Sequence, residues 1–117
     1  MCLDEDLPLK IATGLGAGVG RRQEVCGAVT GGILVLGLRH GRGATADHSA
    51  TERTCLKTRE LMDRFVARHG SCLCRQLLHG YDLSTEDGRR RAKADDMLKK
   101  VCRPCVQTIV EILEEME

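Results

Sequence analysis

The sequence predicts an all-α protein, a compact bundle of about five helices, some of them short. Apolar residues recur every three or four positions in several segments, which is the period of a helix with one buried face. Aromatic residues make up only 2% of the 117 residues, whereas β-strands are enriched in them. The hydrophobic fraction of 42% is sufficient for a packed core, and the length fits a single domain over residues 1–117.

The first helix is expected to begin at Asp6, which can cap it, with Pro8 in its first turn. Its apolar face repeats at intervals of four residues, at Leu7, Ile11 and Leu15. Alternate glycines over residues 14–20 end this helix, and we expect them to form a flexible connector.

Residues 26–40, CGAVTGGILVLGLRH, are predicted to form a buried helix, although their Val and Ile content also suits a buried strand. Gly27, Gly31 and Gly32 each weaken a solvated helix by about 1 kcal/mol relative to Ala. We therefore expect them where another chain segment or a cofactor approaches closely. Gly27 and Gly31 follow Cys26 directly and are the candidates for contact with a cofactor.

The third helix is expected to run from a cap at Asp47 or Ser49 to about His69, with Gly70 just past its end. Its inner stripe is predicted to comprise Cys55, Leu56, Leu61, Met62, Phe65 and Val66. Cys55 is thus expected to be a core residue rather than a reactive thiol.

Two short helices and a longer one are expected to follow. Ser71 can cap the first, which ends at Gly80, and residues 84–87 have the composition of a capped start of the second. The last helix is expected to begin near Pro104. Its apolar stripe is predicted at Val106, Ile109, Val110 and Leu113.

Seven cysteines in 117 residues are the most informative feature of the composition. The N-terminus is acidic and lacks the basic and apolar regions of a signal peptide. An odd number of cysteines without an export signal indicates a reducing compartment, and we expect the protein in the cytoplasm. There, clustered cysteines point to metal binding or thiol redox chemistry rather than to a disulfide framework.

Cys102 and Cys105 form a C-x-x-C pair at the expected start of the last helix. A helix N-terminus stabilises a thiolate, the form that attacks disulfides and binds metals. The spacing would let both sulfurs reach one metal ion or each other. A thioredoxin-like motif would require a preceding strand, and no segment before Cys102 is predicted to be one.

Cys72 and Cys74, and separately Cys26, also lie at expected helix starts. Together with the C-x-x-C pair, C-x-C supplies the four thiolates that a zinc ion or an iron–sulfur cluster requires. The candidate metal ligands are Cys26, Cys72, Cys74, Cys102 and Cys105. His79 is the one credible ligand other than a cysteine. Without a metal, the same thiols could cycle between dithiol and disulfide.

These residues resemble the C-GCAxxG-C-C family of small bacterial and archaeal proteins, described as redox-active. The resemblance covers nearly the whole chain and is carried by residues 9–20, 24–31, 34–38, 74–78 and 82–88, and by the region of Cys102. It implies a helical fold and four cysteines with a redox or metal role. Cys26, Cys74 and Cys102 match three of them and are the candidate redox thiols.

The first cysteine of the family lies in an additional N-terminal helix, for which this sequence has no counterpart. Cys2 comes too late in the pattern to replace it. Either the chain starts late relative to the family, or Cys105 or Cys72 takes the place of the missing thiol.

Composition and pattern exclude several other classes of protein. A net charge of +1 argues against nucleic acid as a partner. The sequence contains no run of eighteen apolar residues, so an integral membrane protein is not expected. The glycines of residues 14–20 do not follow a strand, as a dinucleotide-binding loop would. The basic run at residues 89–93 is expected to be a solvated helix face.

Two functions from different classes remain. The first is a redox protein in which Cys26, Cys74 and Cys102 converge, with sulfurs within roughly 10 Å of one another, and exchange electrons with a redox partner. The second is a helical interaction module without chemistry, in which the glycine-rich helix of residues 28–38 packs against its own copy as a homodimer. No catalytic set of an enzyme acting on a small substrate is recognisable, so the sequence leaves enzymatic activity open.

Overall fold

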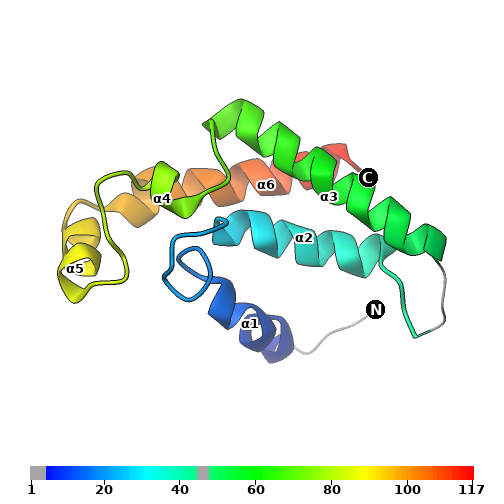
Figure 1. Ribbon diagram of the computed structural model, residues 1–117, viewed down its shortest axis with the longest axis horizontal. Coiled ribbons are helices and arrows are strands. Elements are labelled where there is room, and N and C mark those ends of the chain that lie inside the picture. Colours follow the sequence, from blue (N-terminus) through cyan, green and yellow to red (C-terminus); the bar gives the residue numbers. More distant parts are fainter. Residues whose placement is uncertain (1–4, 45–47) are drawn as a thin grey trace.

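Three helices build the core: α2 (Gly27–His40), α3 (His48–His69) and α6 (Arg103–Glu115). The computed structural model describes residues 5–44 and 48–117, and in Figure 1 these three helices lie side by side. Their facing stripes contribute most of the buried apolar side chains, among them Val29, Leu36, Leu61, Phe65 and Ile112. The all-α class predicted from the sequence is confirmed.

Gly32 lets α2 approach its two neighbours closely. A Cβ atom on Gly32 would lie 2.8 Å from Cγ2 of Ile109 and 3.0 Å from Cδ2 of Leu61. The expectation of close packing is therefore correct at this position. It is wrong at Gly31, where a Cβ atom would meet nothing within 4 Å.

The shorter elements precede and follow this core. They are α1 (Asp6–Ala12), the 3-10 turn η1 (Thr13–Leu15), α4 (Cys74–Leu77), α5 (Glu86–Ala94) and the π-helical turn η2 (Leu98–Cys102). α4, α5 and the start of α6 gather at one end of the molecule, on the left of Figure 1. The predicted capped start of α5 is confirmed, because Thr85 Oγ1 accepts a hydrogen bond of 3.0 Å from the Gly88 N–H.

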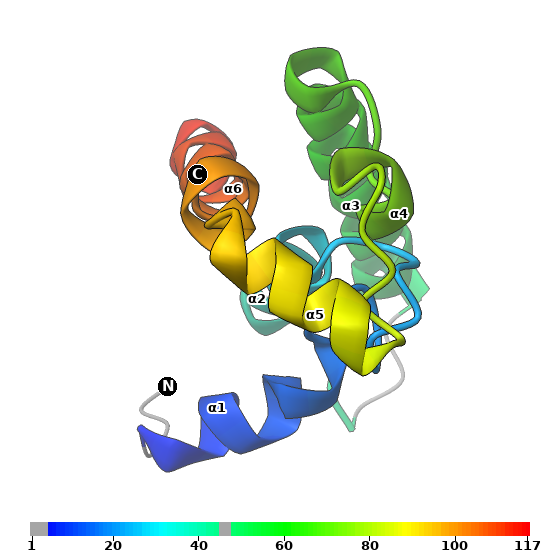
Figure 2. The ribbon, with the colours of Figure 1, turned by 90° about the vertical axis from the view of Figure 1, so that its left-hand side faces the viewer.

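α1 stands apart from the core. Figure 2 shows it directed away from α3 and α6, and none of its residues is buried. Leu9 and Ile11 are 70% and 59% exposed, so its apolar side chains do not reach the core. The predicted cap is wrong: Asp6 is already helical, and the capping residue Glu5 makes no side-chain hydrogen bond.

The core stripe of α3 is narrower than predicted. Leu61 and Phe65 are fully buried, whereas Leu56 is 63% exposed and Cys55 is an exposed thiol. The prediction that Cys55 is a core residue is wrong, because α3 turns only one stripe toward α2 and α6.

The predicted ends of α3 have a mixed outcome. Gly70 adopts a φ of +86° and its N–H donates to the Val66 carbonyl at 2.7 Å, as expected past a helix end. Ser49 lies inside the helix rather than capping it, and Asp47 lies outside the described residues.

The apolar stripe of α6 is rotated relative to the prediction. Ile109 and Leu113 are buried, but Val106 and Val110 are about half exposed, at 52% and 48%. Ile112, which the prediction omitted, is fully buried in their place.

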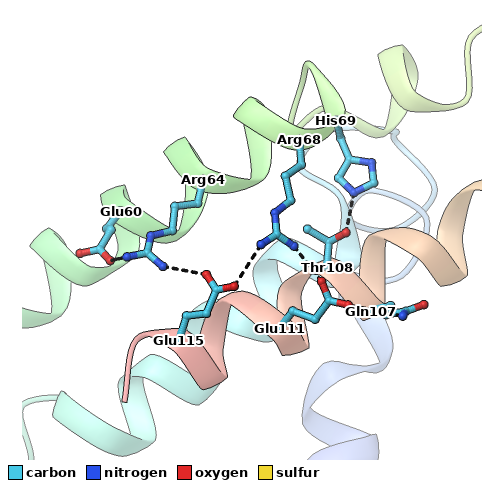
Figure 3. A network of polar contacts seen from close by, with 8 residues as sticks. All are labelled: Glu60, Arg64, Arg68, His69, Gln107, Thr108, Glu111 and Glu115. Carbon is cyan, nitrogen blue, oxygen red and sulfur yellow. Dashed lines mark hydrogen bonds and ion pairs between the residues drawn. The ribbon is translucent and has the colours of Figure 1, made fainter.

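A polar network ties the solvent side of α3 to α6 (Figure 3). Arg68 pairs with Glu111 at 2.8 Å and with Glu115 at 3.2 Å. Arg64 pairs with Glu115 at 3.1 Å, and the His69 ring lies 2.8 Å from Thr108 Oγ1. Exposed pairs of this kind each contribute about 0.2–1 kcal/mol, so the network fixes the orientation of α6 more than it stabilises the fold.

In the described part of the chain, no helix combines the length and the apolar character needed to span a bilayer.

Candidate functional site

A short antiparallel contact brings two cysteine-bearing segments together. The Cys26 N–H donates to the Cys72 carbonyl at 2.8 Å, and the Cys74 N–H donates to the Glu24 carbonyl at 2.7 Å. Between these bonds, Val25 and Leu73 form an isolated β-bridge. Cys26, the N-cap residue of α2, is thereby fixed beside the first residue of α4, Cys74.

The glycine-rich stretch before Cys26 is a hydrogen-bonded left-handed loop. Residues 17–21 and Gln23 all have φ between +52° and +72°. The Glu24 N–H donates to the Gly18 carbonyl at 2.8 Å, closing the loop. Non-glycine residues adopt this conformation at a cost of about 1–2 kcal/mol each, so the surrounding contacts must hold it.

Gly18 is the point where this loop touches the site. A Cβ atom on Gly18 would lie 2.7 Å from Cβ of Cys74 and 2.5 Å from Cα of Gln23. Only glycine therefore fits here, and the loop packs directly on Cys74. The expected flexible connector is in fact the support of a cysteine.

The expectation that Cys102 and Cys105 lie at a free helix N-terminus is wrong. The π-helical turn η2 ends at Cys102 and continues into α6 without a break, with Cys102 in a helical conformation. The dipole argument for these two thiols is therefore wrong. The expectation that no strand precedes these cysteines is confirmed within residues 5–44 and 48–101, where the regular elements are helices and helical turns.

Cys26, Cys74 and Cys102 line one cleft of about 610 Å³. It lies between the left-handed loop, the start of α2, α4, α5 and η2. Apolar side chains form most of its wall: Ala17, Ala28, Leu78, Leu83, Ala92, Met97, Leu98 and Val106. Three charged residues also line it, namely Arg89, Lys93 and Asp96. The structure thus brings the three candidate redox thiols together.

Cys105 and Cys72 lie behind the cleft rather than in its wall. Cys105 is 1% exposed, and an interaction of its thiol with Cys26 is among the causes that raise its pKa. Cys72 is also buried, and its Sγ lies 3.8 Å from the Met62 carbonyl. Cys105 is thus a buried thiol that interacts with the half-buried Cys26.

Burial raises the pKa values of these thiols further above neutral pH. It is the main cause that raises the pKa of Cys74 to about 11 and that of Cys105 to about 12, with negative charge on Cys26 as the next cause. The pKa of Cys72 and that of Cys102 are also raised, for the same two reasons. The expected stabilisation of thiolates is therefore absent at these positions, because desolvation prevails over any helix-end effect.

Gln23 is a site residue that the sequence did not reveal. It is 7% exposed, donates from Nε2 to the Tyr81 carbonyl at 2.9 Å and accepts from the Leu83 N–H at 2.9 Å. Its side chain also hydrogen-bonds Cys74, which lowers the pKa of that thiol against the larger effect of burial. A lone glutamine in a polar stretch gives no signal of this role.

The remaining candidates lie elsewhere. Gly27 lines the cleft, and a Cβ atom there would be 3.1 Å from the Leu15 carbonyl oxygen, whereas Gly31 does not line it. His79 is exposed and is not part of the cleft wall. Within residues 5–44 and 48–117, no three His, Cys, Asp or Glu side chains are arranged closely enough to hold a metal ion.

Fold and site together define a class: a small all-helical protein whose thiols converge on one apolar cleft. A family model described as "Putative redox-active protein (C_GCAxxG_C_C)" matches residues 1–116, and the chain belongs to this family. No curated protein and no solved structure shows a significant match to it.

Within the Gly-Cys-Ala-x-x-Gly segment of the motif in the family's description, the chain differs in the order of two residues. That motif has Gly-Cys before Ala-x-x-Gly, whereas this chain has Cys26-Gly27 before Ala28-x-x-Gly31. The cysteine thus precedes the glycine and occupies the N-cap of α2 rather than its first turn.

Proposed function

We propose that the protein is a thiol–disulfide redox protein with Cys26 as its attacking thiol and Cys105 as its resolving thiol. The observation that carries this proposal is that the buried Cys105 thiol interacts with Cys26, which lines an open cleft. Cys26 is half-buried and accessible from the cleft, whereas Cys105 is buried. This division suits an attacking thiol that meets the substrate and a second thiol that does not.

The exchange would proceed in two balanced steps. The Cys26 thiolate attacks one sulfur of a disulfide, the S–S bond breaks, and the other sulfur leaves and takes up a proton. Cys105 then loses its proton and attacks Cys26 Sγ, which releases the second thiol. The protein is oxidised by two electrons and the substrate is reduced by two.

One feature supports Cys26 as the nucleophile, and two others support thiol exchange in its cleft. It is the N-cap of a fourteen-residue helix, where exposed N–H groups favour negative charge. Cys74 and Cys102 share its cleft and offer alternative partners. A reducing cytoplasm would keep these thiols in the dithiol form between turnovers.

Metal ligation is the other reading of the same thiols. Cys26, Cys72, Cys74, Cys102 and Cys105 are the donors that a zinc ion or an iron–sulfur cluster would use. The described side chains form no group of three ready for a metal, which favours dithiol chemistry. Ligation would require the thiols to move closer and to lose the protons that burial now retains.

The deciding experiment combines metal analysis, thiol counting and disulfide mapping on protein purified without oxygen. We expect little iron or zinc, a loss of two free thiols on treatment with 2-hydroxyethyl disulfide, and a Cys26–Cys105 link in the peptide mass spectrum. Cys55→Ser should lose the same two thiols, because Cys55 is exposed on α3 and lies away from the cleft. Cys26→Ser should lose none.

Two results would overturn the proposal. Near-stoichiometric iron or zinc that disappears in Cys26→Ser would replace it with metal ligation. Independent reaction of all thiols, with no protein disulfide, would remove the redox role altogether.

A second candidate function, a homodimer, rests on the exposed face of α2. Gly31 opens onto empty space, and Leu34 and Leu38 on the same side of the helix are 41% and 57% exposed. Light scattering of the wild type and of Leu34→Glu tests it. A dimer that the substitution converts to a monomer would support self-association, and a monomeric wild type would exclude it.

A further inference from the structure

The cleft beside Cys26 is large enough for a small molecule. Its volume of about 610 Å³ lies within the range of about 300–1,000 Å³ that is typical of ligand sites. Leu78, Leu83, Met97 and Val106 make its wall largely aliphatic. A molecule bound there would therefore need an apolar body.

The charged residues of the cleft suggest the other end of that molecule. Arg89 and Lys93 are four residues apart on α5 and so lie on one face of that helix. The guanidinium of Arg89 is anchored by a hydrogen bond of 2.9 Å from Nη1 to the Leu83 carbonyl. Among the residues that the structure describes, Asp96 is the one carboxylate in the lining. Two cations against one carboxylate favour a negatively charged group on the ligand.

We infer that the cleft binds a small disulfide with an aliphatic body and a carboxylate end, its sulfurs toward Cys26 and its carboxylate toward Arg89 and Lys93. This inference rests on the proposed thiol exchange and names its substrate class. Aliphatic side chains, thiols and two cationic side chains line the same cavity, so one molecule can contact all three groups.

For a cyclic disulfide the exchange balances without any further reactant. Cys26 attacks one ring sulfur, the ring S–S bond breaks, and the second ring sulfur becomes a thiol by taking up a proton. Cys105 then displaces the first ring sulfur from Cys26. The substrate leaves as a dithiol with the two protons of the protein thiols, and the protein keeps the disulfide.

Oxidised lipoate and lipoamide are the probes, because they share a dithiolane ring and an aliphatic arm and differ in the charge at its end. We expect the reduced protein to be oxidised about 3–10 times faster by lipoate than by lipoamide at low ionic strength. The ratio should approach one in 0.5 M NaCl, where charge interactions across the cleft mouth are screened.

Lys93→Gln tests the proposed carboxylate contact, because Lys93 is exposed and its loss should not disturb folding. This variant should lose most of the preference for lipoate over lipoamide. Lys10→Gln is the matched control, since Lys10 is exposed on α1 and does not line the cleft, and it should keep the preference.

The outcomes separate this inference from the function on which it rests. Equal rates with both probes, or a preference that survives Lys93→Gln, would overturn the inference and leave thiol exchange standing. No oxidation by either probe would overturn the proposed function and the inference with it.

Discussion

Single residues around Cys74 show how the cysteine cluster is held. Gly18 and Gly20 both have positive φ, of +72° and +60°, but only Gly18 lies against other atoms. Gly20 has nothing within 4 Å of a Cβ position. The two glycines therefore separate the effect of backbone conformation from the effect of crowding beside Cys74.

Gly18→Ala should lower the free energy of unfolding by about 3 kcal/mol, because strain of about 1–2 kcal/mol adds to a steric clash of similar size. Gly20→Ala should lower it by only about 1 kcal/mol, through strain alone. Denaturant unfolding of both variants measures the difference. Equal losses would show that the loop does not press on Cys74.

The raised thiol pKa values predict how stability depends on pH. An unfolded thiol has a pKa of 9.0, whereas that of folded Cys74 is about 11 and that of folded Cys105 about 12. Between pH 9 and these values the unfolded chain has released protons that the folded chain still holds. The free energy of unfolding should therefore fall as pH rises above 9, by at most about 1.4 kcal/mol per pH unit for each thiol.

Cys105→Ala should make this alkaline fall shallower, and Cys55→Ala, at an exposed position, should leave it unchanged. Denaturant unfolding in reducing buffer at pH 7, 9 and 10.5 measures the slopes. Parallel curves for the wild type and Cys105→Ala would contradict the assigned burial of the Cys105 thiol.

At the scale of elements, the close contact of α2 with α3 and α6 depends on Gly32. Gly32→Ala should destabilise the protein by about 1–3 kcal/mol, because the added methyl group would crowd Ile109 and Leu61. Gly37→Ala, on the exposed side of the same helix, should stabilise it by up to about 1 kcal/mol through higher helix propensity. Thermal or denaturant unfolding distinguishes the two, and a neutral Gly32→Ala would contradict the packing.

The elements also show what a sequence can predict. Periodicity was sufficient to predict that α3 and α6 are helices, since each buries side chains repeated at helical spacing. For α2, the length of the segment and the helical pattern before it favoured a helix over a strand. Periodicity could not predict that Cys55 and Leu56 stay exposed, because the number of neighbours that cover a helix is set by the tertiary arrangement. Nor could it predict the π-helical turn before Cys102, which depends on how α5 joins α6.

The candidate site was predictable in part. The family resemblance and the cysteine spacing singled out Cys26, Cys74 and Cys102, which share the cleft. The contact of Cys26 with Cys105 and the bonds of Gln23 were not predictable, because they join segments that are far apart in the sequence. Their effect on the thiols depends on burial, which spacing alone does not reveal.

At the scale of the whole molecule, core and site are parts of one arrangement. α2 has Cys26 as its N-cap residue and packs along α6, which begins beside Cys102 and contains Cys105. The ion pairs of Figure 3 hold α6 against α3 from the opposite side. The proposed disulfide between Cys26 and Cys105 would therefore act directly on the contact between two core helices.

A redox titration of the Cys55→Ser variant in buffers of reduced and oxidised glutathione tests the central claim most directly. The account predicts a single reversible two-electron transition, with about 30 mV for each tenfold change in the ratio of dithiol to disulfide, and its loss in Cys26→Ser. A protein that stays fully reduced at every ratio, or that forms only mixed disulfides with glutathione, would contradict a redox pair at this cleft.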